Sequence, residues 1–215
     1  MPTINVNGVE LYYKESGRGP ETIVFSHGLL MDHSMFEAQR AAFDRRYRVI
    51  AYDHRGQGQS QDPGTPPQQT KPASAGDPGH GYDMETLTED AAALIQALNA
   101  APCHFAGLSM GGFVGMRLAA RHRQLVRSLT LMNTGAQKEE TFSRLKFGLL
   151  AQLVKVLGTG PFTGIAVKEL FGKSTRLSQS PAKQAMLAEW KAKLGSRPKN
   201  VAHALMGVMT RGCFH

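Results

Sequence analysis

The sequence predicts an α/β fold: a mostly parallel sheet with flanking helices, followed by a helical cap. Over residues 1–136, short runs rich in β-branched and aromatic residues alternate with longer amphipathic runs. This alternation is typical of a parallel sheet covered by helices. After residue 136 the β-type runs end and helical periodicity takes over. We therefore expect a core domain at residues 1–136 and a helical cap or lid at residues 137–215.

Six strands are expected in the core, and their composition indicates their places in the sheet. The predicted strands lie near residues 3–6, 9–14, 22–26, 48–52, 103–107 and 128–133. Asn7-Gly8 separates the first two, and this dipeptide readily adopts the positive φ angles of a tight hairpin turn. "TIVFS" and "RVIAYD" are nearly continuous apolar runs, which predicts central strands buried on both faces.

Two segments between the strands differ sharply in their helical character. "TLTEDAAALIQALNA", residues 86–100, predicts a surface helix that begins with Thr86 and Glu89 at capping-box spacing. Residues 61–81 contain five prolines and four glycines, which predicts a long surface loop.

Composition and charge exclude several classes of protein. The net charge is +8, but residues 1–136 carry −1 and residues 137–215 carry +9, with no aromatic interleaving or nucleic-acid motif. The N-terminus has no basic start followed by an apolar run, and no window approaches eighteen apolar residues. Cys103 and Cys213 lie 110 residues apart, without metal-ligand spacing. We expect a cytoplasmic protein that binds neither nucleic acid nor a membrane.

The stretch "HFAGLSMGGF" contains the candidate nucleophile, Ser109. Gly107-Leu108-Ser109-Met110-Gly111 fits the pattern G-x-S-x-G, between a predicted strand and a predicted helix. Such a turn is sharp, and residues two positions from the serine must be small to avoid collision. The alternative is a glycine-lined turn without chemical use.

A serine that attacks a carbonyl group needs two backbone N–H groups directed at the developing negative charge. Met110, directly after the serine, is predicted to supply one. The loop after "IVFS" contains His27 and Gly28, and the next residue, Leu29, is predicted to supply the other. His27 is expected to brace this loop by hydrogen bonding rather than to act as a base.

"FSHGLL", "AYDHRGQGQS" and "GLSMGGFVG" together resemble the α/β-hydrolase superfamily, in particular its esterase and enol-lactonase-like branch. The resemblance implies that Ser109 is the nucleophile and that the Leu29 and Met110 amides, beside Gly28, form the oxyanion hole. It implies a small ester or lactone substrate and neither a metal nor an organic cofactor. It also implies a structural role for the loop Asp53–Ser60.

The catalytic acid and histidine of that superfamily have no counterpart after Ser109. No aspartate follows Ser109, and the later glutamates and histidines all lie in segments with helical periodicity or at the chain end. These residues are Glu139, Glu140, Glu169, Glu189, His122, His203 and His215. The resemblance also ends before strands seven and eight, so we expect a truncated chain of impaired activity. We also expect an exposed sixth strand edge that favours self-association or a complementing chain.

A rival interpretation is a non-catalytic module that binds a small ligand or another protein on the same fold. Five apolar residues are candidates for the lining of a pocket, and ordinary core packing is the alternative for each. They are Met31, Met35, Leu108, Phe113 and Trp190.

Overall fold

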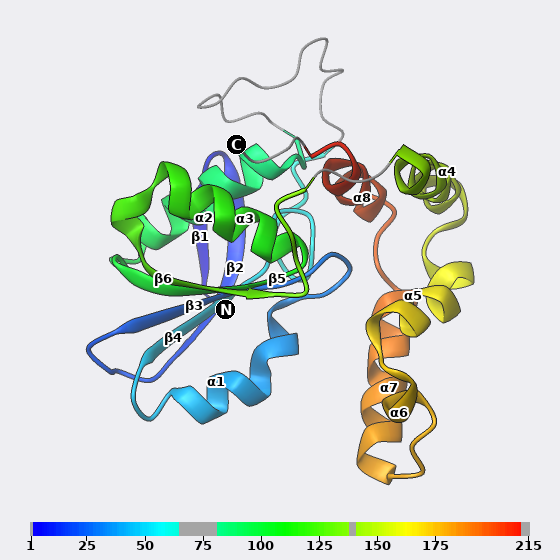
Figure 1. The fold of residues 1–215 in the computed structure, drawn as a ribbon, viewed down its shortest axis with the longest axis horizontal. Coiled ribbons are helices and arrows are strands. Elements are labelled where there is room, and N and C mark those ends of the chain that lie inside the picture. The colour runs from blue at the N-terminus through cyan, green and yellow to red at the C-terminus, as the bar shows by residue number, and fades with distance from the viewer. Residues whose placement is uncertain (1, 65–80, 138–140, 212–215) are drawn as a thin grey trace.

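A six-stranded sheet forms the core of the protein in a computed structural model that describes residues 2–64, 81–137 and 141–211. The order of the described strands is β1-β2-β4-β3-β5-β6 (Figure 1). Their bounds are β1 Thr3–Val6, β2 Val9–Ser16, β3 Thr22–Ser26, β4 Arg48–Tyr52, β5 Cys103–Leu108 and β6 Val126–Met132. All six predicted strands are present, and the boundaries differ from the predictions by at most two residues.

The sheet is antiparallel at one edge and parallel elsewhere. β1 pairs antiparallel with β2, and β2 pairs antiparallel with β4, whereas β3 pairs parallel with β4 and β5, and β5 parallel with β6. Asn7 and Gly8 have φ angles of 49° and 74°, as expected for the predicted hairpin turn.

The central strands are buried on both faces, as their continuous apolar sequences predict. On β3, Ile23 and Phe25 belong to one hydrophobic cluster and Val24 belongs to another. On β4, Val49 belongs to the cluster of Ile23 and Phe25, and Ile50 belongs to the cluster of Val24. Neighbouring side chains of a strand point to opposite faces, so both faces of the sheet carry a hydrophobic core.

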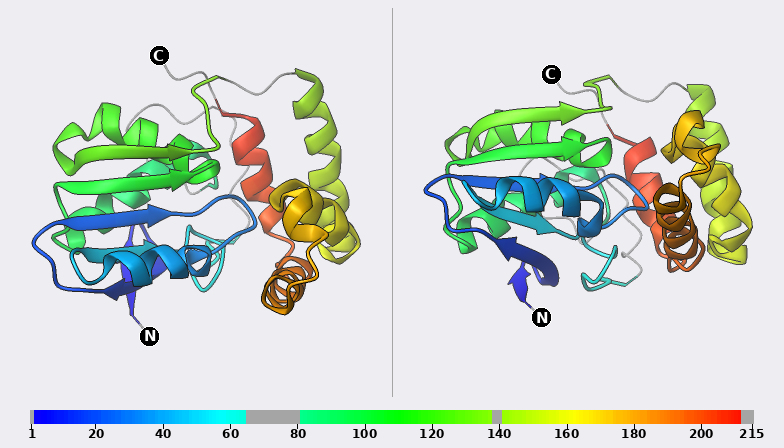
Figure 2. Two further views of the ribbon diagram at one scale, coloured as in Figure 1. Left: turned by 60° about the horizontal axis from the view of Figure 1, so that its bottom comes forward. Right: turned by 90° about the horizontal axis from the view of Figure 1, so that it is seen from below.

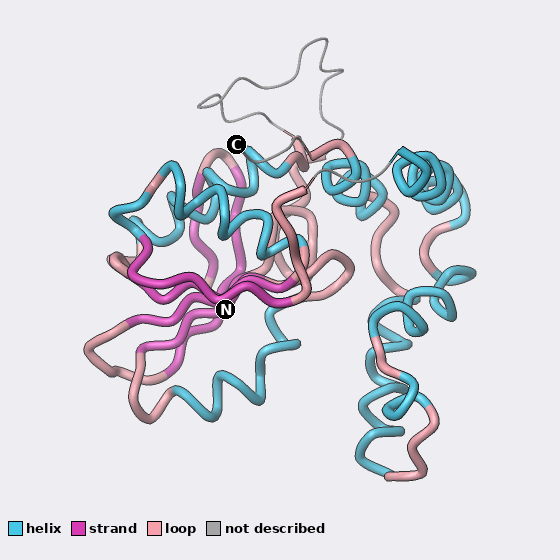
Figure 3. Tube along the Cα trace, in the orientation of Figure 1, coloured by secondary structure: helices cyan, strands magenta, loops and turns pink. Residues whose placement is uncertain are grey.

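Three helices cover these faces. They are α1 Glu37–Phe43, α2 Met84–Ala97 and α3 Met110–Arg121. Helices α2 and α3 pack together on one face, and α1 lies on the opposite face (Figures 1 and 3). The result is a three-layer α/β arrangement around a mostly parallel sheet.

Helix α2 begins earlier than the sequence predicts. Its N-cap is Asp83, whose carboxylate accepts hydrogen bonds from the Thr86 backbone N–H at 2.9 Å and from the Thr86 hydroxyl at 2.8 Å. The predicted capping box of Thr86 and Glu89 is therefore wrong, because both residues lie within the helix. Most of the predicted 61–81 loop lies outside the described residues.

In the described residues, five α-helices follow β6 and form a layer at one end of the sheet. They are α4 Thr141–Leu157, α5 Thr163–Leu170, α6 Lys173–Arg176, α7 Pro181–Gly195 and α8 Val201–Met209. This layer lies at the end toward which the parallel strands point (Figure 2). None of the described helices is both long and apolar enough to cross a lipid bilayer.

Helix α8 contacts both the core and the cap. Val208 and Met209 belong to the hydrophobic cluster between the sheet and α2, whereas Val201 and Ala202 pack against α4. The proposed division at residue 136 stays a prediction.

β6 is the outermost strand of the described sheet and pairs there only with β5. Leu131 on this strand is 44% exposed. The described structure therefore has the open strand edge that the sequence predicts, and a second chain at this edge stays a prediction.

Candidate active site

Ser109 lies at a sharp turn between β5 and α3. Its φ and ψ angles are 49° and −110°, a backbone conformation that residues with a side chain rarely adopt. A Cβ atom added to Gly107 would lie 2.3 Å from the carbonyl oxygen of Gly111, and one added to Gly111 would lie 2.1 Å from that of Ser26. The steric reason for both glycines of the G-x-S-x-G pattern is therefore present in the structure.

The end of β6 supports this turn. The Ser109 N–H donates to the Met132 carbonyl oxygen at 2.9 Å, and the Thr134 hydroxyl donates to the Ser109 carbonyl oxygen at 3.0 Å. The strained backbone is thus fixed on both sides of the serine. Sequence analysis missed Thr134, because nothing in its local pattern indicates a contact 25 residues away.

The loop after β3 lies beside the serine. β3 and β5 are neighbours, with Ser26 opposite Gly107, so their carboxyl ends meet at one edge of the sheet. A Cβ atom added to Gly28 would lie 3.6 Å from the Ser109 Cβ and 2.9 Å from a Leu108 side-chain carbon. Only a glycine permits this close approach without displacing Leu108.

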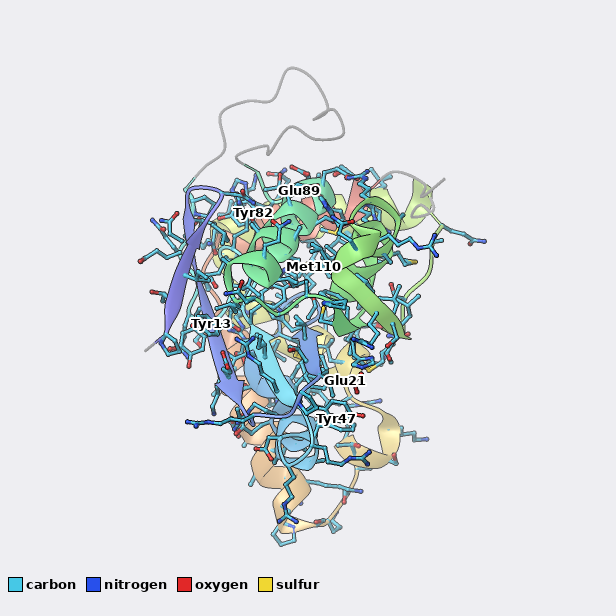
Figure 4. The ribbon with its side chains drawn as sticks, turned by 90° about the vertical axis from the view of Figure 1, so that its left-hand side faces the viewer. Tyr13, Glu21, Tyr47, Tyr82, Glu89 and Met110 are labelled. Carbon is cyan, nitrogen blue, oxygen red and sulfur yellow. The ribbon has the colours of Figure 1, made fainter. Side chains whose placement is uncertain are left out.

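The backbone amides of Leu29 and Met110 are the two predicted for an oxyanion hole, and that role stays a prediction. Leu29 directly follows Gly28, and its N–H has no hydrogen-bond acceptor among the described residues. Met110 is the first residue of α3, where backbone N–H groups have no acceptor within the helix. Its side chain is buried between the sheet and the helices above it (Figure 4).

His27 braces the loop, as the sequence predicts. Its Nε2 accepts a hydrogen bond from the His54 backbone N–H at 3.0 Å, so its Nδ1 carries the proton and donates to the Gly28 carbonyl oxygen at 2.8 Å. Burial lowers the pKa of His27 and lowers that of His54 further. A neutral His27 with both ring nitrogens engaged positions the backbone of this loop.

Asp32, His33 and Asp53 are grouped beside the same loop, and their ligand atoms lie within 4.8 Å of one another. Asp53 accepts hydrogen bonds from the His33 backbone N–H at 2.6 Å and from the Gln59 N–H at 2.8 Å. Protein donors therefore already bind these carboxylate oxygens, and the group links the loop after β3 to the loop after β4. Absence of a cofactor stays a prediction.

The cap also holds the loop. Arg197 donates from Nε to the Leu30 carbonyl oxygen at 2.9 Å and from Nη2 to Asp32 at 2.7 Å. Lys193 donates to the Ser34 hydroxyl at 2.9 Å. Leu30 has a φ angle of 68°, so the residue after Leu29 is itself strained and is held by Arg197. Sequence analysis did not find these contacts.

Of the four acids and histidines after Ser109 that the structure describes, three have other partners. His122 lies 3.1 Å from the Glu89 carboxylate, and the His203 ring is tilted by 35° against the Tyr82 ring, with 5.6 Å between the ring centroids. Glu189 pairs with a lysine on its own helix, and Glu169 is exposed. His215, Glu139 and Glu140 lie outside the described residues.

The five candidate pocket residues pack in the core or beneath the cap. Phe113 belongs to the cluster under α2 and α3, and Met35 and Leu108 pack against the cluster on the opposite face. Met31 and Trp190 are buried, and the Lys193 ammonium lies 4.8 Å from the centre of the Trp190 ring. None of the five lines the apolar cavity that lies between the loop after β3 and the helices of the cap.

Comparisons with known proteins agree with this geometry. A family model described as the alpha/beta hydrolase fold matches residues 21–162. 3-Oxoadipate enol-lactonase 2 of Acinetobacter baylyi is 30% identical over 170 residues, which are 79% of this chain and 57% of that protein. 3-Oxoadipate enol-lactonase 1 of the same organism is 35% identical over 122 residues, 55% of this chain and 40% of that protein. The chain thus spans about half the length of these curated relatives.

Among solved structures, the enol-lactonase from Burkholderia xenovorans LB400 superimposes with a TM-score of 0.81 at 27% identity, covering 99% of this chain and 75% of that one. The parallel sheet and the strained serine turn at the carboxyl end of its strand β5 define the fold class. The chain belongs to the alpha/beta hydrolase fold family. This confirms the family that the three sequence motifs predict.

Proposed function

We propose that the protein is a serine hydrolase that cleaves a carboxylic ester or lactone through an acyl-enzyme on Ser109. The observation that carries the proposal is the strained backbone of Ser109, at φ 49° and ψ −110°, directly beside the Gly28–Leu29 loop. Similarity to enol-lactonases supports this reaction class. We assign neither a metal nor an organic cofactor to the reaction.

In the proposed reaction, the Ser109 oxygen attacks the carbonyl carbon and gives up its proton to a base. The carbonyl oxygen becomes negatively charged and accepts hydrogen bonds from the Leu29 and Met110 amides. Collapse of this intermediate breaks the bond to the leaving alkoxide, which takes a proton, and water then hydrolyses the acyl-enzyme. Release of the carboxylic acid restores the serine hydroxyl.

We further propose that the 215-residue chain is impaired, because no histidine contacts Ser109 among the described residues. A serine hydroxyl with no neighbouring base is a poor nucleophile at neutral pH. Positioned amides alone retain roughly 10³–10⁴-fold catalysis over water in the serine-protease case. Slow reaction at Ser109 is therefore expected.

A fluorophosphonate probe tests the proposal, because it labels reactive serines irrespective of substrate. We expect slow labelling that Ser109→Ala abolishes and Ser128→Ala retains. Ser128 is a matched control, since its hydroxyl lies 2.7 Å from His104 Nδ1 but is remote from the loop after β3. The labelling rate should rise about tenfold per pH unit between pH 7 and 9, as expected when hydroxide removes the proton.

Three outcomes would count against parts of the proposal. Fast labelling with a plateau near pH 7 would mean that this chain supplies its own base, and impairment would be wrong. Labelling that survives Ser109→Ala would exclude Ser109 as the nucleophile. Folded protein that never reacts would favour the rival function, a binding module that retains the hydrolase fold.

A further inference from the structure

A cavity of about 210 Å³ lies between the loop after β3 and the cap helices. Leu29 and Leu30 line it on the core side, and Phe147, Leu150 and Val154 of α4 line it on the cap side. Residues of α5, α7 and α8, together with Thr159 and Phe162 between α4 and α5, complete its wall. Leu29 links this cavity with the serine turn, because Leu29 lines the cavity and directly follows Gly28, where an added Cβ atom would lie 3.6 Å from the Ser109 Cβ.

The lining offers a ligand almost no polar contact. Thr159 and Thr163 are two of its polar residues, and both hydroxyls donate to backbone carbonyl oxygens of the cap. Glu169 is the one ionisable residue of the described lining. It is exposed, as is Ile165, so these two residues mark the side where the cavity meets solvent.

We infer that this cavity binds the uncharged hydrocarbon part of the substrate, and that it discriminates against acyl groups that carry a carboxylate. This inference rests on the proposed function of Ser109. Leu29 supplies both the proposed oxyanion amide and part of the cavity wall, so a carbonyl group at that amide would lie within one residue of the cavity.

Two physical effects set the direction of this selectivity. Each methylene group that leaves water for an apolar wall strengthens binding by about threefold to fourfold. An ionised carboxylate in the same wall would have no cationic partner, because neither lysine, arginine nor histidine is part of the described lining. The Glu169 charge at the mouth would also repel an approaching anion.

Binding can be measured apart from catalysis on the Ser109→Ala protein. The probe is N-phenyl-1-naphthylamine, an uncharged dye that fluoresces in apolar sites, and the competitors are methyl octanoate and monomethyl suberate. These two esters have the same chain length, but the second ends in a carboxylate. We expect methyl octanoate to displace the dye at a concentration at least about tenfold lower at pH 8. Equal competition, or better competition by monomethyl suberate, would overturn the inference.

A matched pair of variants and one charge reversal locate the binding site. Ala166 lines the cavity, so Ala166→Trp should weaken binding of methyl octanoate at least about tenfold. Ala185→Trp, on the exposed face of α7, should not change it. Glu169→Lys should improve competition by monomethyl suberate several-fold and leave methyl octanoate unchanged. Circular dichroism verifies the fold of each variant, and the comparison of the two esters requires no cavity variant.

The two proposals fail independently of each other. If Ser109 does not react with the probe but methyl octanoate is clearly preferred, the proposed function is wrong and the apolar ligand site still stands. If Ser109 is labelled but methyl octanoate is not preferred, only the inference about substrate class is wrong. Dye binding that Ala166→Trp leaves unchanged would place the ligand elsewhere and also overturn the inference.

Discussion

Replacing Arg197 by methionine should destabilise both the fold and the proposed oxyanion hole. Methionine retains an unbranched apolar stem but removes the donors to Leu30 and Asp32, at 2.9 and 2.7 Å. Burial raises the pKa of Asp32, but hydrogen bonds from Ser34 and Arg197 outweigh burial and hold that pKa well below its usual range. Without Arg197, a buried carboxylate would lose its cationic partner.

The expected cost is about 3 kcal/mol in the free energy of unfolding. Breaking a buried ion pair by removing one partner costs about 3–5 kcal/mol, and a hydrogen bond to a charged group contributes about 1.5–3 kcal/mol. The lower end applies because the Arg197 and Asp32 side chains are 10% and 9% exposed. For a chain of this length, about 3 kcal/mol corresponds to a fall of roughly 6–12 °C in melting temperature.

Urea and thermal unfolding monitored by circular dichroism would measure this cost. Arg176→Met is the matched control, since Arg176 donates to the Phe171 carbonyl oxygen within the cap and pairs with no acid among the described residues. The effect of Arg197→Met should shrink below about pH 4, because Asp32, with its lowered pKa, loses its stabilising contribution as it becomes protonated. Labelling of Ser109 should slow at least about tenfold.

The reasoning would be refuted if Arg197→Met cost no more than Arg176→Met. A double-mutant cycle with Asp32→Asn gives a second test. The two single changes should be non-additive, because both remove the same ion pair. Additive effects would mean that Arg197 acts through packing alone.

Three further predictions concern the remaining structure. Gly111→Ala should abolish Ser109 labelling, because its Cβ atom would collide with the Ser26 carbonyl oxygen of β3. Gly148→Ala, in open space on α4, should retain labelling and raise the free energy of unfolding by about 0.5–1 kcal/mol. Equal labelling of the two variants would contradict this. Burial lowers the pKa of His27 and His54, so the unfolded chain binds more protons than the folded protein below about pH 6.5. Urea titrations should therefore show the free energy of unfolding falling by roughly 1–3 kcal/mol for each unit of pH below that value. A constant free energy of unfolding down to pH 5.5 would exclude this. Arg55→Met should cost about 3–5 kcal/mol, since it leaves a buried carboxylate of α2 without its cation, and an unchanged melting temperature would refute that role.

Local features of the fold could be predicted because each depends on a few neighbouring residues. The apolar run Thr22–Ser26 and the turn at Asn7-Gly8 are examples, and both occur where predicted. The start of α2 could not be predicted in the same way. Asp83 and Thr86 are both acceptable caps, and only the observed contacts show that the Asp83 carboxylate caps the helix.

In the candidate site, too, local features could be predicted and contacts between distant residues could not. The Ser109 turn was predictable, because the pattern G-x-S-x-G spans five residues and the requirement for glycine at Gly107 arises within them. The requirement at Gly111 comes from the Ser26 carbonyl oxygen of the neighbouring strand β3. The contacts of Thr134 and Arg197 were not, because they lie 25 residues from Ser109 and 167 residues from Leu30. No periodic pattern indicates a contact over such a separation, and only the packing of the cap against the loop creates it.

Arg197 and Lys193 connect the two halves of the candidate site. The core fixes the serine and the amides through contacts of β3, β5 and β6, whereas the cap forms most of the apolar cavity. Both cationic side chains extend from the cap to the loop that carries the Leu29 amide. Movement of the cap would therefore alter both the shape of the cavity and the position of the amide. We expect variants at this contact to change kcat and KM together, and cavity variants such as Ala166→Trp to change mainly KM.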